Sequence, residues 1–318
     1  MLRALLIYLS QAPWARKIVM NLSIARRVSS RFVAGETLGD AVAAIKTLNE
    51  QGMFATFDHL GEFTSVPEEA KEARDAAIRM IDAIVHENLQ SGISIKLTQI
   101  GMGFDPVLCA ENLAYILSYA QQYGVFVRID MEDSSYTTLT FDIFNEMWNG
   151  LGMRNVGMVL QSYLYRSEKD LRQLMSEGVR VRMTKGAYRE PPEVSYQDKS
   201  DVDQSFDQLV DIMMKGTAEN DNPVATGRLP AIPAIASHDE ERIEYAKLSA
   251  ARHNVPKNAL EFQMLFGIRR EIQEALVKEG YPVRIYVPYG TQWYPYFMRR
   301  LAERPANLWF FVSNLLRR

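Results

Sequence analysis

The stretch GVRVRMTKGAY, residues 178–188, shows most clearly how this chain folds. Valine and methionine alternate with arginine from 179 to 183, which predicts a β-strand because strand side chains point alternately to two faces. The glycine before the run suits the turn that leaves a helix, where a positive φ is needed. Lys185 and Gly186 follow the run, so the strand should end in a charged, glycine-containing loop.

The same order, a short apolar run followed by a helical segment, recurs along the chain. Runs typical of strands lie at 53–57, 93–97, 125–129, 156–160, 179–183, 232–236, 260–264 and 283–287. Segments with helical periodicity lie at 68–89, 106–123, 168–176, 204–215, 240–252, 269–277 and 293–307. Gly52, Gly92, Gly124 and Gly178 precede four of the runs, again where a turn needs positive φ. Strands that alternate with helices in this way predict a closed parallel (β/α)8 barrel of the TIM type.

We expect a single domain over the whole chain, in three parts: a helical arm at 1–50, the barrel at 51–307, and an apolar, basic tail at 308–318. The last helix, at 293–307, is expected to lie over the barrel mouth. A doubly wound sheet is the structural alternative, and it would usually carry a GxGxxG turn after a strand. The nearest match, at Gly101 and Gly103, has Pro106 where the third glycine belongs.

Composition favours a protein that acts on a small molecule. Of the 318 residues, 47% are hydrophobic and 24% are charged, so the chain can bury a large core. The net charge is −3 and no block of Lys and Arg occurs, which argues against nucleic acid as a partner. The single cysteine, Cys109, cannot form an intrachain disulfide, and the histidines lack the spacing of a metal site. No metal is expected.

The N-terminus carries a short apolar run, ALLIYL, at 4–9. This run is too short to span a bilayer. It is similar to the core of a signal peptide but lacks the small-residue cleavage pattern, and Trp14, Arg16 and Lys17 follow it. We therefore interpret residues 1–20 as an amphipathic helix that packs on the barrel, and we expect a cytoplasmic protein.

Polar side chains stand at the ends of all the predicted strands, and this predicts an active site at one end of the barrel. They are Asp58, Lys96, Asp130 with Glu132 and Asp133, Gln161, Arg182 with Lys185, His238, Gln263 and Tyr286. The carboxyl ends of barrel strands build the active sites of such enzymes, and a charge in an apolar strand is costly to bury without a partner. Taken singly, each residue has the alternative interpretation of a rim salt bridge or a satisfied core group.

The strand quoted first carries the most informative of these ends. Arg182 lies two residues from Arg180 and from Thr184, so the three share one strand face. Gly186 lets backbone N–H groups approach an anion, and the cations around it suit a pyrophosphate or the electron-rich edge of a flavin. A surface strand with a ladder of arginines is the alternative.

The segment at 293–307 predicts a helix with a binding face. Tyr296, Arg300 and Glu303 fall on one stripe of that helix, and Arg299 flanks it. Two adjacent guanidinium groups suit a carboxylate, because each planar fork can make paired hydrogen bonds. Glu303, one turn further on, suits an amine, so an amino-acid zwitterion is the natural ligand. A solvated face of Arg and Glu is the alternative.

These segments resemble the proline dehydrogenase family, in particular its short monofunctional bacterial members. The resemblance runs from Phe54 to Asn307 and rests on RMTKGAY (182–188), SHD (237–239), EFQML (261–265), YVPYG (286–290) and YFMRRLAERPAN (296–307). It implies a (β/α)8 barrel that binds FAD and oxidises L-proline to Δ1-pyrroline-5-carboxylate, the first step of proline degradation to glutamate. Two positions differ from the usual pattern: Ser237 replaces a threonine, and Arg189 stands where long bifunctional relatives tend to carry tryptophan.

The resemblance also implies roles for individual residues. Catalytic groups near the flavin and the substrate ring would be Asp130, Arg182 and Tyr286. Substrate contacts would be Lys96, Arg299 and Arg300 on the carboxylate, Glu303 near the amine, Leu265 beside the ring, and Glu62 as the loop acid that pairs with the first arginine. Contacts with FAD would be Met131, Gln161, Lys185, Gly186, Ala187, Tyr188, Ser237, His238 and Gln263.

The resemblance implies partners as well. Electrons would pass to a quinone, and pyrroline-5-carboxylate dehydrogenase would be a functional partner. The tail at 308–318 is interpreted as a helix packed on the barrel, with peripheral contact at the inner face of the membrane as the alternative. Two other functions remain open: a Schiff-base aldolase that uses Lys96 or Lys185, and a non-catalytic proline sensor.

Overall fold

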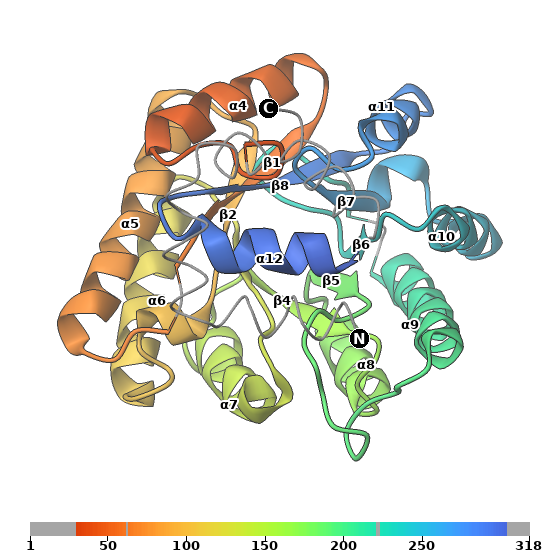
Figure 1. Ribbon diagram of the computed structural model, residues 1–318. Coiled ribbons are helices and arrows are strands. Elements are labelled where there is room, and N and C mark those ends of the chain that lie inside the picture. The colour runs from red at the N-terminus through yellow and green to blue at the C-terminus, as the bar shows by residue number, and fades with distance from the viewer. Residues whose placement is uncertain (1–29, 62, 221–222, 304–318) are drawn as a thin grey trace, which may run out of the picture.

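The structure of the chain, a computed structural model, describes residues 30–61, 63–220 and 223–303, with the backbone alone for 299–303. Parallel strands close into a barrel in sequence order: β1 (Phe54–His59), β2 (Ser91–Ile95), β3 (Val127–Ile129), β4 (Val156–Gln161), β5 (Val181–Thr184), β6 (Pro233–Ala236), β7 (Glu261–Leu265) and β8 (Val283–Tyr289). β8 closes the barrel against β1, with Ile285 beside Ala55 (Figure 1). All the predicted strands and the (β/α)8 fold are confirmed.

Helices surround this barrel (Figure 1). They are α4 (Leu38–Glu50), α5 (Pro67–His86), α6 (Pro106–Gln122), α7 (Ser134–Asn145), α8 (Ser167–Ser176), α9 (Lys199–Glu219), α10 (Glu240–Arg252), α11 (Arg270–Lys278) and α12 (Trp293–Glu303), with short turns η1 (Leu97–Ile100), η2 (Glu146–Gly150) and η3 (Lys257–Ala259). Pro67 and Pro106 occupy first helical positions, where a missing N–H costs nothing. Asp105 caps α6 by accepting from the N–H groups of Val107 and Leu108. Within the described residues, no helix is both long and apolar enough to cross a membrane.

Helix α7 was not predicted from the sequence. Its residues, SSYTTLTFDIFN, are mostly hydroxyl-bearing or aromatic, and both kinds have weak helix propensity. Two other features compensate: Asp133 accepts a hydrogen bond from the N–H of Ser135 at 3.0 Å, and Thr137 and Phe141 are buried. Tertiary packing and a cap therefore determine a helix that local preference does not indicate.

The glycines before the strands confirm three of the four expected turns. Gly52, Gly124 and Gly178 have φ of 78°, 63° and 69°, which a residue with a side chain rarely adopts. The prediction for Gly92 is wrong, because Gly92 lies inside β2 and has no positive φ. A Cβ there would lie 2.8 Å from the carbonyl oxygen of Phe126 on the neighbouring chain segment, so close backbone approach is what requires glycine.

The interior of the barrel is polar, whereas its outer wall is apolar. Strand residues such as Phe57 and Ile129 point outward and belong to the buried core between the sheet and the helices. Arg182 on β5 instead reaches Asp130 beyond β3 and Gln263 on β7, contacts that cross the inside of the barrel. TIM barrels commonly fill this space with Val, Ile and Leu, so a charged interior must supply its own partners.

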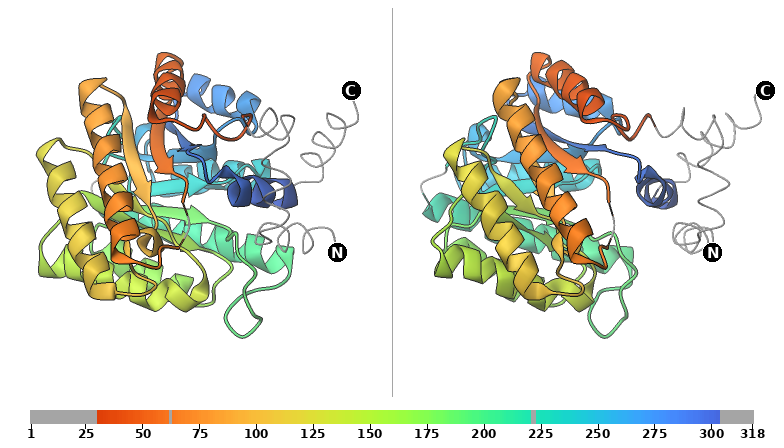
Figure 2. Two further views of the ribbon diagram at one scale, coloured as in Figure 1. Left: turned by 60° about the vertical axis from the view of Figure 1, so that its left-hand side comes forward. Right: turned by 90° about the vertical axis from the view of Figure 1, so that its left-hand side faces the viewer.

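Helix α12 lies over one end of the barrel, beyond the carboxyl ends of the strands (Figures 1 and 2). Pro295 and Tyr296 of this helix line the same cavity as Asp130 and Tyr286, which come from strand ends. The predicted helix over the barrel mouth is therefore confirmed as far as residue 303.

Candidate active site

A cavity of about 490 Å³ opens at the carboxyl ends of the strands, beneath α12. Sites for small molecules commonly measure roughly 300–1,000 Å³. Every residue to which the family resemblance gives a role, and whose side chain is described, lines this cavity, whereas the predicted strand-end acids Glu132 and Asp133 do not. The lining residues with such a role are Lys96, Asp130, Met131, Gln161, Arg182, Lys185, Gly186, Ala187, Tyr188, Ser237, His238, Gln263, Leu265 and Tyr286. The closure of the barrel thus brings together residues that are far apart in the sequence.

Asp130, which directly follows β3, is the centre of the polar network in this cavity. Its Oδ1 accepts hydrogen bonds from Ser94 at 2.6 Å and from Arg182 at 2.8 Å. Its Oδ2 accepts from the hydroxyl of Tyr286 at 2.7 Å and from Lys96 at 3.3 Å. Burial opposes the ionised form, but the charges of Lys96 and Arg182 outweigh it and hold the pKa of Asp130 below its ordinary value. The carboxylate therefore stays ionised at neutral pH.

Lys96 lies between two carboxylates, at 3.1 Å from Asp58 Oδ1 and 3.3 Å from Asp130 Oδ2. Burial alone would lower the pKa of Lys96, yet Asp58 and the other nearby groups raise it well above its ordinary value. An ammonium that stays protonated is a poor nucleophile, which counts against an imine at Lys96. Asp58 Oδ2 is buried and has no hydrogen-bond partner among the described residues, so it is suited to accept one from a ligand.

Arg182 and Tyr286 pack against each other, with the guanidinium 5.3 Å from the centre of the phenol ring. Burial and the neighbouring Asp130 raise the pKa of Tyr286 well above its ordinary value, so its hydroxyl remains a donor. Arg182 donates through Nε to Gln263 Oε1 at 2.5 Å and through Nη1 to Asp130. The protein's own contacts therefore orient a positive charge at the wall of the cavity.

The loop after β5 is held by ion pairs and by one close packing contact. Lys185 pairs with Asp203 of α9 and, at 2.7 Å, with Asp239. Gly186 has a φ of 119°, and a Cβ there would lie 2.5 Å from the ring of Tyr163. Glycine is thus required at 186 by the backbone and by this aromatic neighbour. The predicted approach of an anion to its N–H stays a prediction.

Three further predicted residues are held at the wall by named contacts. His238 accepts from the N–H of Leu265 through Nε2 at 3.0 Å, which places the ring proton on Nδ1. Ser237 accepts from the N–H of Asp239 at 3.1 Å. Gln161 is 3% exposed, and within the described part of the chain its Oε1 has no hydrogen-bond partner. A buried amide oxygen in this position calls for a donor from a ligand or from water.

Two residues of the polar network had no role predicted from the sequence, Ser94 and Asp58. Ser94 lies two residues before Lys96, so both side chains point into the barrel, and that spacing is the pattern that would have found it. Asp58 was noted as a polar strand end, but its pairing with Lys96 depends on the register of β1 with β2.

The remaining predicted substrate contacts stay predictions. Glu62 lies outside the described residues. Arg299, Arg300 and Glu303 belong to α12, whose backbone crosses the mouth. The structure describes only their backbone. The predicted N-terminal helix at 1–20 and the tail at 308–318 also lie outside the described residues.

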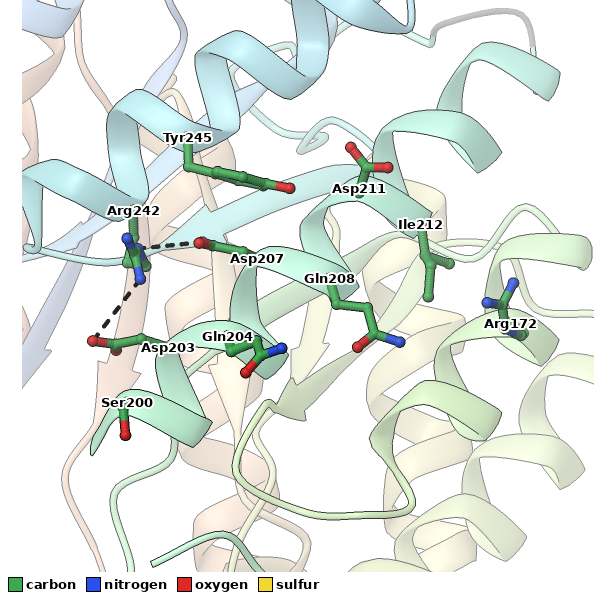
Figure 3. Close-up of a pocket in the computed structure, with 10 residues that line it drawn as sticks. All are labelled: Arg172, Ser200, Asp203, Gln204, Asp207, Gln208, Asp211, Ile212, Arg242 and Tyr245. Atoms are coloured by element: carbon green, nitrogen blue, oxygen red, sulfur yellow. Dashed lines mark ion pairs between the residues drawn. The ribbon is translucent and has the colours of Figure 1, made fainter. Parts of the chain in front are cut away.

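A larger hollow of about 820 Å³ lies on the outer face of the molecule, between α8, α9 and α10 (Figure 3). Arg242 is paired there with Asp207 at 3.2 Å and with Asp203 at 3.9 Å. None of the predicted site residues lines this outer hollow. The candidate active site is therefore the cavity at the barrel mouth.

Comparison with known proteins supports the resemblance seen in the motifs. The family model described as proline dehydrogenase matches residues 41–312. Proline dehydrogenase 1 of Bacillus subtilis (strain 168) is 39% identical over 318 residues, which are 100% of both chains. The proline dehydrogenase of Deinococcus radiodurans is 41% identical over 307 residues, covering 95% of this chain and 93% of that relative.

A solved structure shows the same fold. The crystal structure of proline utilization A (PutA) from Bdellovibrio bacteriovorus, inactivated by N-propargylglycine, matches with a TM-score of 0.77 at 24% identity. The match covers 87% of this chain and 32% of that longer chain. Together with the family model and the two bacterial relatives, it leads to one conclusion: the chain belongs to the proline dehydrogenase family.

Proposed function

We propose that this protein oxidises L-proline at its C5–N bond, giving Δ1-pyrroline-5-carboxylate, with FAD as its cofactor. Membership of the family supports a redox enzyme with a redox cofactor. The single observation that carries the proposal is the cavity at the barrel mouth, where Lys96, Arg182 and Tyr286 meet around Asp130 beneath α12. Fixed cations next to a partly apolar wall suit a small amino acid and an electron-accepting ring.

The residues of the cavity fit a flavin. Gln161 Oε1 is a buried acceptor that needs a donor, as an N–H of a flavin ring would provide. Lys185 uses two of its three N–H donors on Asp203 and Asp239, which leaves one for a phosphate oxygen. The residues that would hold FAD are Met131, Gln161, Lys185, Gly186, Ala187, Tyr188, Ser237, His238 and Gln263. When bound, FAD would supply the hydride acceptor, and Arg182 would favour the negative charge that the ring gains.

Proline would bind between the strand ends and α12. Arg299 and Arg300 would hold its carboxylate, together with Lys96. The described contacts of Lys96 measure 3.1–3.3 Å. Charge-assisted hydrogen bonds are usually about 2.7–2.9 Å, so the ammonium can turn towards a substrate without giving up a tight contact. The other substrate contacts would be Leu265 and Tyr286 on the ring, Glu303 near the amine and Glu62 at the entrance.

The chemistry requires the substrate amine to be neutral. Its lone pair forms the C=N bond as a hydride leaves C5, and the N–H proton is then lost. The clustered positive charge of Arg299, Arg300 and Lys96 would favour the neutral amine. Asp58 lines the cavity, and its Oδ2 has no hydrogen-bond partner among the described residues, so that oxygen would accept a hydrogen bond from the N–H.

The test is the visible spectrum of the purified full-length protein. Absorbance bands of oxidised flavin that fade when L-proline is added without oxygen support the proposal. A protein that binds proline while its flavin bands stay unchanged would be a sensor instead. A colourless protein that borohydride links covalently to a carbonyl substrate would be an aldolase, and either result would overturn the proposal.

We further propose that the electrons pass to a quinone and that the tail at 308–318 packs on the barrel as a helix, with contact at the inner face of the membrane as the alternative. The tail is apolar with a basic end, a combination that favours anionic lipid surfaces. If the tail touches the membrane, co-sedimentation with anionic liposomes will be strong for the full chain and lost for a chain ending at 307. Equal sedimentation of both would leave the tail as a helix packed on the barrel. The product is the substrate class of a pyrroline-5-carboxylate dehydrogenase, the proposed functional partner.

A further inference from the structure

A chain of hydrogen bonds leads from the cavity down the inside of the barrel, away from the mouth. Arg182 Nε donates to Gln263 Oε1, and Gln263 Nε2 donates to Glu261 Oε1, each at 2.5 Å. Glu261 accepts from Arg284 through Nε at 2.9 Å and through Nη2 at 3.1 Å. All four side chains are buried, and Glu261 is 0% exposed. Glu261 does not line the cavity, and the chemistry proposed above does not use it.

The side-chain amide of Gln263 has a defined orientation in this hydrogen-bond network. The oxygen of an amide accepts and its nitrogen donates, but the two ends are nearly identical in shape. A carboxylate only accepts, so Glu261 can bond to Gln263 solely through Nε2. That contact turns Oε1 of Gln263 towards the mouth, where it meets the Nε–H of Arg182, a group that only donates.

Arg284 holds Glu261 in place from the side away from the barrel mouth. Its Nη1 donates to the carbonyl oxygens of Ala55 at 2.8 Å and Gly227 at 3.0 Å, and its Nη2 donates to that of Thr226 at 2.9 Å. Backbone carbonyl groups cannot rotate away as a side chain can. The carboxylate of Glu261 is therefore fixed by the scaffold and not by the ligands of the cavity.

We propose that Glu261 is a positioning residue, which acts through Gln263 to set the plane of the Arg182 guanidinium. Gln263 accepts a hydrogen bond from Nε of that group and Asp130 accepts one from Nη1, so two contacts fix its orientation. Without Glu261 the amide can reverse and present N–H groups to the Nε–H of Arg182, and two facing donors would turn the guanidinium away. The inference rests on the proposed function only in that Arg182 serves the reaction.

The test compares variants of the full-length protein labelled with 15N-arginine. Glu261→Leu combined with Arg284→Met removes both members of the buried pair, so that neither is left as a lone charge. Glu261→Met keeps the approximate length of the side chain but has no carboxylate to accept from Gln263, and it decides the question where the double variant does not fold. Asn112→Leu is the matched control, because Asn112 is 2% exposed and donates at 3.0 Å to Ile100 outside the barrel.

The first readout is hydrogen exchange of the Nε–H of Arg182, which is identified by its disappearance in Arg182→Lys. We expect slow exchange in the wild type and in Asn112→Leu, and exchange at least about tenfold faster in the Glu261 variants. Unchanged Arg182 exchange in a folded Glu261 variant would overturn the proposal, because Glu261 would then be only the counter-ion of Arg284.

Proline turnover provides the second readout. A guanidinium that is present but misoriented should lower kcat by about tenfold and leave the KM for proline within about twofold of the wild type. An equal fall of kcat in Asn112→Leu would overturn the positioning role. If the wild type does not oxidise proline at all, the proposed function fails, whereas the exchange of Arg182 still decides the role of Glu261.

Discussion

The cavity at the barrel mouth and the outer hollow between α8, α9 and α10 both contain paired Asp and Arg, yet their aspartates behave in opposite ways. Asp130 in the cavity is buried, and its pKa is lowered because cations and hydroxyl donors outweigh burial. Asp207 in the outer hollow has an ion pair with Arg242 at 3.2 Å, and burial nevertheless raises its pKa. What distinguishes an organised site is therefore the number and direction of the donors, and not the presence of charge in a hollow.

The largest effect that follows from this contrast is on stability. Asp130→Asn should lower the free energy of unfolding by about 3–5 kcal/mol at pH 7, because buried Arg182 loses the carboxylate it pairs with and Lys96 keeps only Asp58. Since the folded-state pKa of Asp130 lies below its ordinary value of 3.8, its stabilisation is present above that pH and is lost as the pH falls through the folded value. Urea unfolding at pH 7 and at a pH below the folded-state pKa of Asp130 measures the difference. An equal loss at both pH values would show that the charge is not responsible.

The next largest effect is on catalysis, and a comparison of variants at two arginines tests it. Arg182→Met should lower kcat by about 100- to 1,000-fold, the usual cost of removing a fixed donor from developing charge. Arg172→Met, in the outer hollow, removes an exposed partner of Glu168 and should leave kcat within about twofold. Steady-state kinetics with proline test both. Similar losses in the two variants would remove the distinction between the two regions.

Substrate affinity should depend on the helix over the mouth. Arg299→Met and Arg300→Met should each raise the KM for proline by about 10- to 100-fold, as expected for one lost charge-assisted pair, while the flavin absorbance is retained. Arg270→Met, at the start of α11, is the exposed control. Unchanged proline kinetics in both α12 variants would remove the assignment of the carboxylate site.

A smaller effect is expected on selectivity. Tyr286→Ser should reduce the preference for proline over hydroxyproline by about tenfold, because the ring of Tyr286 would no longer limit the space beside the substrate. The matched change in the outer hollow, Tyr245→Ser, should leave the ratio of kcat/KM values as it is. Unaltered selectivity in Tyr286→Ser would mean that another residue sets the size of the pocket.

The sequence was sufficient to predict the barrel, because every strand and most of the helices that follow them carry their own local pattern. The run at 179–183 alternates, and Gly178 precedes it with the expected positive φ. Helix α7 shows the limit of such local information, since its residues favour other structures and only packing makes them helical.

The partners within the site could not be read from the sequence. Lys96 and Tyr286 are separated by 190 positions and meet only because β8 closes against β1. Glu261 could not be distinguished from an ordinary strand acid, because its importance depends on Gln263 and Arg284 lying beside it inside the barrel. Residue types at strand ends can thus be predicted locally, whereas the pairs among them are set by barrel closure and register.

The smallest expected effect is that of Asp207→Asn on the free energy of unfolding, and it has the opposite sign to the effect of Asp130→Asn. The raised pKa of Asp207 means that the folded state holds this proton more tightly than the unfolded chain, so stability falls as the pH rises from 3.8 through the folded value. Asp207→Asn removes that loss, and Arg242 still pairs with Asp203 and Glu241. At pH 7 the unfolding free energy of the variant should equal that of the wild type or exceed it by up to about 0.5 kcal/mol. The value is modest because Asp207 is partly exposed. Urea unfolding at pH 7 tests this, and a loss of several kcal/mol would mean that the outer hollow is as organised as the cavity.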